Sequence, residues 1–170
     1  MNGHYLGTAQ TYLKEEIQVE QLVRKLNPFR KFLEISAQSN GKVVNFSAIA
    51  RDVMADTKTV QEYFHILEDT LLGTLLEPYH ASIRKRQRHN PKFYFFDTGV
   101  TRALAKTLTQ ELLPQTYAFG NAFEHFVINE IFRLNAYQNK DYSFSYLMTK
   151  DDAEIDLIVE RPCMPTALIE

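Results

Sequence analysis

Three carboxylates in the second half of the chain have the spacing of a divalent-cation site. Glu124 falls in a periodic apolar segment that predicts a helix, Asp156 lies inside the strand-like run 154–159, and Glu170 ends the next strand-like run. Carboxylate oxygens are good ligands for Mg²⁺, and a bound Mg²⁺ polarises a phosphodiester and helps to generate hydroxide. We therefore expect Glu124, Asp156 and Glu170 to be catalytic residues, with Asp156 and Glu170 as the metal ligands.

A helix glutamate followed by two strand carboxylates is the order that a PD-(D/E)XK-type nuclease needs. Such a site normally has a lysine two residues after the second strand carboxylate, and that position lies beyond residue 170. The competing interpretation is a solvated acidic turn. It fits the acids at 151, 152 and 154 better than Asp156, because apolar residues flank Asp156 on both sides.

The elements that must position these acids form a small α/β unit. Periodicity predicts helices at 100–108 and 121–134, and alternation predicts strands at 142–148, 154–159 and 166–170. Since the sequence stops inside the last of these strands, we expect a partial nuclease-like domain over residues 97–170 that is truncated at its C-terminus.

The first half predicts a helical lead-in followed by a helix-turn-helix. Apolar spacing indicates helices at 11–26 and 28–37, and two further helices at 48–54 and 58–72 with a short turn at 55–57. A strand-like run, a basic stretch and the aromatic strand 93–96 follow. This order is typical of a winged helix, so we expect residues 1–96 to form a winged-helix domain and the whole chain to be α+β.

Polar and basic side chains of this predicted domain suit nucleic acid. The start of a recognition helix reaches base edges in the major groove, and basic loop residues contact phosphates. The residues expected to bind nucleic acid are Lys58, Thr59, Gln61, Arg84, Lys85, Arg86, Arg88 and Lys92. The alternative is that the basic hairpin docks on an acidic protein neighbour, and Glu62 beside these residues counts against tight independent DNA binding.

Charge and composition exclude several classes of protein. The net charge of −2 combines +3 over residues 1–92 with −5 over residues 93–170, which suggests two different roles. One cysteine, Cys163, permits no internal disulfide, and neither a signal peptide nor an apolar run of about 20 residues is present. We expect a cytoplasmic protein with no membrane partner. The sequence has no G-x-x-x-x-G-K-[ST] phosphate loop.

Several motifs together resemble one family. They are the run Pro91-Lys92-Phe93-Tyr94-Phe95-Phe96-Asp97-Thr98-Gly99, then Gly120-Asn121-Ala122-Phe123-Glu124, then Glu154-Ile155-Asp156, and the final Leu168-Ile169-Glu170. The chain resembles the C-terminal region of prokaryotic AAA+-like P-loop ATPases, which carries a domain of unknown function. The resemblance implies a winged helix followed by a restriction-endonuclease-like fold, with the ATPase core and its ATP upstream of this sequence. It also implies that Glu124, Asp156 and Glu170 form the acidic site.

Three hypotheses for function follow. The chain is an accessory region of an ATPase that contacts DNA or the ATPase core, or it is part of a magnesium-dependent nuclease, or it is a protein-interaction module that assembles homo-oligomers or binds a partner protein.

Overall fold

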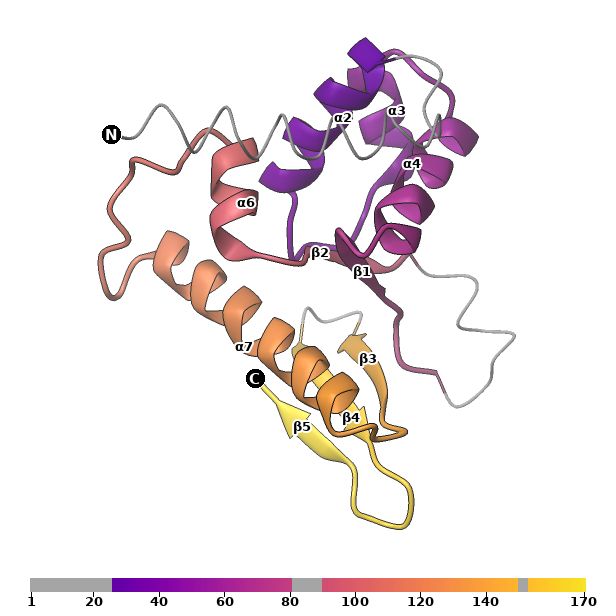
Figure 1. Ribbon diagram of the computed structural model, residues 1–170, viewed down its shortest axis with the longest axis vertical. Coiled ribbons are helices and arrows are strands. Elements are labelled where there is room, and N and C mark those ends of the chain that lie inside the picture. The colour runs from indigo at the N-terminus through magenta and orange to yellow at the C-terminus, as the bar shows by residue number, and fades with distance from the viewer. Residues whose placement is uncertain (1–25, 81–89, 150–152) are drawn as a thin grey trace.

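The computed structural model describes residues 26–80, 90–149 and 153–170, and the chain is mixed α+β as expected. Within these residues there are five helices and two small antiparallel sheets (Figure 1). The helices are α2 (Leu26–Gln38), α3 (Phe46–Val53), α4 (Thr57–Asp69), α6 (Thr98–Leu104) and α7 (Tyr117–Tyr137). The strands are β1 (Gly73–Leu76), β2 (Lys92–Phe95), β3 (Ser143–Met148), β4 (Glu154–Glu160) and β5 (Ala167–Ile169). The helix expected at 11–26 lies almost entirely outside the described residues.

Local capping defines the two helices of the predicted helix-turn-helix. The Asn45 side chain accepts a hydrogen bond from the Ala48 amide at the start of α3. Met54 ends that helix in the left-handed conformation, with φ 57°. Asp56 then caps α4 by accepting from the Thr59 amide at 2.7 Å. Each capping side chain accepts from a backbone amide that has no partner inside its helix and so fixes where that helix begins. Because α3 ends at Met54 and Asp56 caps α4, the turn between the two helices occupies Met54–Asp56.

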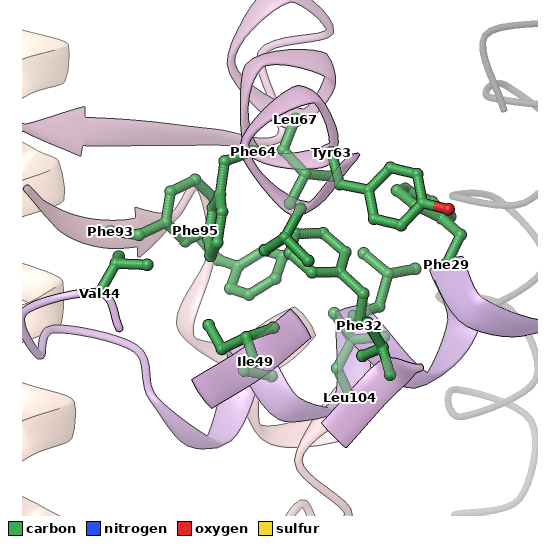
Figure 2. Packing of buried hydrophobic residues seen from close by; sticks show 14 of the residues in the cluster. Phe29, Phe32, Val44, Ile49, Tyr63, Phe64, Leu67, Phe93, Phe95 and Leu104 are labelled. Carbon is green, nitrogen blue, oxygen red and sulfur yellow. The ribbon is translucent and has the colours of Figure 1, made fainter. Parts of the chain in front are cut away.

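Aromatic side chains from α2, α4 and β2 form the first hydrophobic core. Figure 2 shows Tyr63 and Phe64 pointing from α4 into this core. The Phe64 ring meets Phe32 edge-to-face at 4.8 Å and Phe93 at 4.9 Å, the arrangement that aromatic quadrupoles favour. Helices α2 and α4 therefore pack together against the hairpin strand β2.

The β1–β2 hairpin is the junction between the two parts of the fold. β1 and β2 pair antiparallel from Gly73↔Phe95 to Leu76↔Lys92. A Cβ at Gly73 would overlap the Phe93 ring and lie 2.9 Å from the Tyr94 carbonyl oxygen, so the close pairing needs glycine. Because successive strand residues face opposite sides, Phe93 and Phe95 enter the first core while Tyr94 enters a second one.

The second core lies between α7 and the sheet β3-β4-β5. Its buried members are Leu76, Tyr94, Ile128, Tyr146, Leu157 and Val159. β3 pairs with β4 and β4 with β5, both antiparallel. Pro78 also forms a parallel bridge to Tyr146, so the chain after β1 continues along β3.

Polar side chains one turn apart fix α7 to the end of β2. The carbonyl oxygen of Phe95 accepts hydrogen bonds from His125 Nε2 at 2.6 Å and from Asn129 Nδ2 at 2.9 Å. Arg133, one turn further along α7, donates to the carbonyl of Phe96. Burial of His125 and Asn129 is tolerated because both side chains have this acceptor.

Candidate functional site

Two of the predicted acids line one cavity between α7 and the hairpin. This cavity, here called the carboxylate pocket, has a volume of about 360 Å³. It is lined by Asn40, Gly41, Lys42, Val43, Lys92, Tyr117, Asn121, Glu124, Met148, Glu154 and Asp156. Helix α7 supplies Glu124, β4 supplies Glu154 and Asp156, and β2 supplies Lys92, so the pocket combines residues from both halves of the sequence.

Lys92 is the buried cation of the carboxylate pocket, whereas Lys42, which also lines it, is exposed. Only 2 % of Lys92 is exposed. Its ammonium forms an ion pair with Glu154 and lies 3.4 Å from Asp156 Oδ1. The ammonium also lies 5.5 Å from the centre of the Tyr146 ring. A buried lysine needs such partners, since an unpaired charge out of water is costly. Lys92 is expected from the sequence to contact phosphate, whereas its ammonium lies inward against two carboxylates.

Tyr94, two residues along β2, holds the third carboxylate. Its hydroxyl donates a 2.8 Å hydrogen bond to Glu124 Oε1. Partial burial raises the pKa of Glu124 and the nearby Asp156 adds to the rise, while the Tyr94 hydrogen bond and Lys92 oppose it. Burial, followed by the Glu124 charge, raises the pKa of Tyr94, which therefore stays protonated and keeps donating.

Glu170 is exposed, and its position just after β5 is opposite Asp156, which lines the pocket. β4 and β5 pair at Leu157↔Ile169, and continuing this antiparallel register by one residue places Glu170 opposite Asp156. In the described part of the chain, no three His, Cys, Asp or Glu side chains are grouped closely enough to hold a metal ion. As placed here, these acids do not form a cation cage by themselves, and Lys92 supplies the positive charge that Asp156 faces.

Tyr94 and Glu154 are not among the site residues predicted from the sequence, although Glu154 lines this pocket and Tyr94 holds Glu124, which also lines it. The run Lys92-Phe93-Tyr94-Phe95 held a usable signal, because two polar residues alternate with two phenylalanines and so share one side of a strand. The partners across the fold are far away in sequence, 64 residues for Lys92 and Asp156. Nothing local in the sequence indicates which carboxylates they meet.

The outward side of α4 is the second candidate surface. Lys58 and Gln61 are exposed, as are Glu62 and His65. Thr59 differs from expectation, since its hydroxyl donates to Asp56 Oδ2 at 2.9 Å and is part of the helix cap. Arg84, Lys85, Arg86 and Arg88 lie outside the described residues. Among the helices that are described, none has the length and apolar character needed to cross a membrane.

Two family models match different parts of the chain. Residues 119–170 match a domain of unknown function, DUF4143. The chain is 30 % identical over 159 residues to uncharacterized proteins of Mycobacterium tuberculosis (Rv2008c) and Mycobacterium bovis (Mb2031c). These matches cover 94 % of this chain but 35 % of each relative, so the chain spans about a third of the length of the curated relatives. No solved structure matches the chain. Residues 4–111, more than half of the sequence, match the domain of unknown function DUF8612, and the chain belongs to that family.

Proposed function

We propose that this chain is the DNA-contacting accessory part of a longer P-loop ATPase, and that it acts through a winged helix formed by α3, α4 and the β1–β2 hairpin. The observation that carries the proposal is the outward side of α4, where Lys58 and Gln61 are exposed near the capped helix start. The length of the curated relatives outside the matched region supports a longer parent protein.

The chemistry of this side suits a duplex. The first turns of a recognition helix approach base edges, where an amide such as Gln61 reads adenine and an ammonium such as Lys58 contacts a phosphate or guanine. The segment between β1 and β2 contains four arginines or lysines, at positions 84, 85, 86 and 88. Glu62, also exposed, weakens purely electrostatic attraction. We therefore expect moderate, salt-dependent binding.

Fluorescence anisotropy with a labelled DNA duplex tests this function. We expect affinity to fall at least tenfold between about 50 and 200 mM salt, since contacts with phosphates release counterions. Lys58→Ala and Arg84→Ala/Arg86→Ala should each weaken binding and lower the salt dependence, by about one unit of slope per lost phosphate contact. Lys106→Ala removes an exposed lysine outside α4 and is the matched control.

Two results would reject DNA contact. One is binding that does not change with salt, and the other is equal affinity for wild type, Lys58→Ala and Arg84→Ala/Arg86→Ala. Copurification with the ATPase part, without DNA binding, would instead favour the protein-interaction hypothesis.

The carboxylate pocket supports a second candidate, a phosphodiester-cleaving site in the longer protein. Glu124 and Asp156 line the same cavity, and Glu170 follows β5 at the register position opposite Asp156. In the described residues these acids are not grouped closely enough to hold a metal ion by themselves, so Mg²⁺, the ion that would activate a phosphodiester in such a site, would need further ligands from the longer protein. Lys92 and Tyr94 would then orient Asp156 and Glu124 through the contacts described above.

Cleavage by the longer protein tests this candidate. We expect Mg²⁺-dependent nicking of plasmid DNA that is lost in Asp156→Asn and reduced in Glu124→Gln. Asp141→Asn, which removes an exposed carboxylate in the loop before β3, should leave cleavage unchanged. Cleavage that survives Asp156→Asn would exclude the pocket as the catalytic site.

A further inference from the structure

A second cavity lies where α6 meets the end of α2 and the start of α7 (Figure 1). This cavity, here called the α6 cavity, has a volume of about 330 Å³, which is within the range of small-molecule sites. Its wall includes Asn40, Lys42, Arg102, Tyr117, Asn121 and His125. None of the site residues predicted from the sequence lines the α6 cavity, so this cavity needs its own explanation.

Hydrogen bonds hold the wall of the α6 cavity in place. The Nη2 atom of Arg102 donates to three backbone carbonyl oxygens within residues 107–110, which fixes the loop after α6. The Gly41 amide donates to the Phe93 carbonyl at 2.9 Å, which ties the segment around Gly41 to β2. The α6 cavity is therefore already formed without a ligand, as small-molecule sites usually are.

One residue of β2 orients two polar side chains of this wall. The Phe95 amide donates a 2.8 Å hydrogen bond to Asn40 Oδ1, and the Phe95 carbonyl oxygen accepts from His125 Nε2 at 2.6 Å. The remaining polar atoms are Asn40 Nδ2 and His125 Nδ1, and neither has a protein partner among the residues that the structure describes. Burial lowers the pKa of His125, so the ring is neutral at pH 7.5 and its Nδ1 accepts a hydrogen bond. The wall therefore offers a ligand one oriented donor and one oriented acceptor.

Two exposed residues of the wall, Tyr117 and Lys42, lie close together. Tyr117 is 74 % exposed, and the Lys42 ammonium lies 6.0 Å from the centre of its ring. An exposed aromatic ring stacks on a base and a neighbouring ammonium pairs with a phosphate, which is how proteins bind unpaired nucleotides. This pair therefore supplies contacts for both ends of a nucleotide.

The α6 cavity and the carboxylate pocket are neighbours, because Lys42 and Tyr117 line both of them. The acids of the carboxylate pocket already have partners within it, namely the ammonium of Lys92 and the hydroxyl of Tyr94. Since Lys42 is exposed and its ammonium lies over a ring, its charge remains available to a phosphate from solvent.

We propose that the α6 cavity binds a nucleotide, with the base in the cavity against Tyr117 and the phosphate at Lys42. The edge of a base carries donors and acceptors, which Asn40 and His125 match, and the amide of Asn121 provides one of each. A bare anion would use Lys42 and leave the ring and the polar wall without a role. The nucleotide is either free or an unpaired nucleotide of a strand. The proposal does not depend on duplex contact through α4 or on cleavage in the carboxylate pocket.

Calorimetric titration at pH 7.5 tests this site, with adenosine 5′-monophosphate (AMP) and a short single-stranded deoxyadenosine oligonucleotide as the two probes. Both supply a base and a phosphate, so we expect the chain to bind at least one of them. Tighter binding of the oligonucleotide would identify a strand as the ligand, and equal or tighter binding of AMP would identify a free nucleotide. Failure of both probes to bind at about 1 mM would overturn the proposal.

Substitutions of the two exposed residues test how the nucleotide lies. Tyr117→Ala should weaken AMP binding at least about fivefold, the usual loss for a stacked base, and Tyr117→Phe should retain it. Tyr137→Ala removes an equally exposed tyrosine at the other end of α7 and should bind AMP like wild type. Lys42→Ala should weaken binding of AMP but leave that of adenosine, which has no phosphate, unchanged. Unchanged AMP binding in Tyr117→Ala, or an equal loss of both ligands in Lys42→Ala, would contradict the proposed arrangement.

Lys58→Ala separates this site from the proposed duplex contact. It should leave AMP binding unchanged, because Lys58 lies on α4 and does not line the α6 cavity. Asn121→Leu keeps a side chain of similar size, removes the amide, and should weaken binding of AMP and of adenosine alike. Loss of AMP binding in Lys58→Ala, with wild-type affinity in Asn121→Leu, would place the nucleotide on α4 and overturn the proposal.

Discussion

The phenol of Tyr94 and the carboxylate of Glu124 share a 2.8 Å hydrogen bond, which joins the hairpin strand β2 to helix α7. Tyr94 is buried in the second core, and Glu124 lines the carboxylate pocket. Tyr94 belongs to the region that matches DUF8612, and Glu124 belongs to the region that matches DUF4143. A residue of the first region therefore positions a carboxylate of the second.

Tyr94→Phe should destabilise the fold by about 2 kcal/mol, the usual worth of a partly buried hydrogen bond to a charged group. It should also raise the pKa of Glu124 further, because the Tyr94 hydrogen bond opposes the rise caused by burial. Urea denaturation measures the first effect and carboxyl-carbon NMR titration the second. Tyr137→Phe, which removes an exposed hydroxyl, is the control. A Glu124 pKa that stays the same or falls in Tyr94→Phe would contradict this account.

His125 should make stability depend on pH near neutrality. Its Nε2 faces a carbonyl oxygen, which accepts only, so this nitrogen carries a proton. Burial lowers the pKa of His125 in the folded state. The unfolded chain then binds more protons between that lowered value and about 6.5, so stability falls as pH drops through this window.

Urea midpoints at pH 7.5 and 5.5 measure this dependence. His125→Gln keeps an amide donor near the Phe95 carbonyl and should lose less stability than wild type between the two pH values. His65→Gln changes an exposed histidine and should behave like wild type. An identical pH response in wild type and His125→Gln would show that His125 does not titrate differently on folding.

Lys92→Met should cost about 2–3 kcal/mol. Removing one partner of a buried ion pair leaves the other charge uncompensated, and the cost here is below that of a fully buried pair because Glu154 and Asp156 are partly exposed. The triple variant Lys92→Met/Glu154→Gln/Asp156→Asn should recover part of this loss, which urea denaturation would detect as non-additivity. A loss below about 0.5 kcal/mol in Lys92→Met would argue against the ion pairs.

Alanine substitution at two glycines should change stability in opposite directions. Gly73→Ala forces a methyl group into the Phe93 ring and should cost about 2 kcal/mol or more. Gly120 lies inside α7, where an added Cβ meets no atom within 4 Å, so Gly120→Ala should stabilise the fold by up to about 1 kcal/mol. Thermal unfolding of both variants measures the difference. A rise in the unfolding temperature of Gly73→Ala would contradict the packing at Gly73, and a fall in that of Gly120→Ala would contradict the open space at Gly120.

The helices and strands could be predicted from local sequence patterns, whereas the carboxylate pocket could not. Periodicity and turn residues predicted α3, α4 and β4 within a few residues, because caps such as Asp56 and apolar spacing act over one or two helical turns. Helix α7 begins at Tyr117, four residues earlier than expected, because Thr116 caps it and Gly120 is tolerated inside it. The inward turn of Lys92 depends on carboxylates more than 60 residues away, which no local pattern reveals.

The strand β2 has a consequence for how the chain can be divided. Phe93 and Phe95 belong to one hydrophobic core and Tyr94 belongs to the other. The four residues of β2 therefore contribute to both cores. The sequence suggested a domain boundary between residues 96 and 97. Cleavage there would separate Tyr94 from Glu124 and Lys92 from Asp156, so both carboxylates would lose these partners. We therefore expect the two halves to melt together as one cooperative unit, and an isolated 97–170 fragment to expose its unfilled core and aggregate.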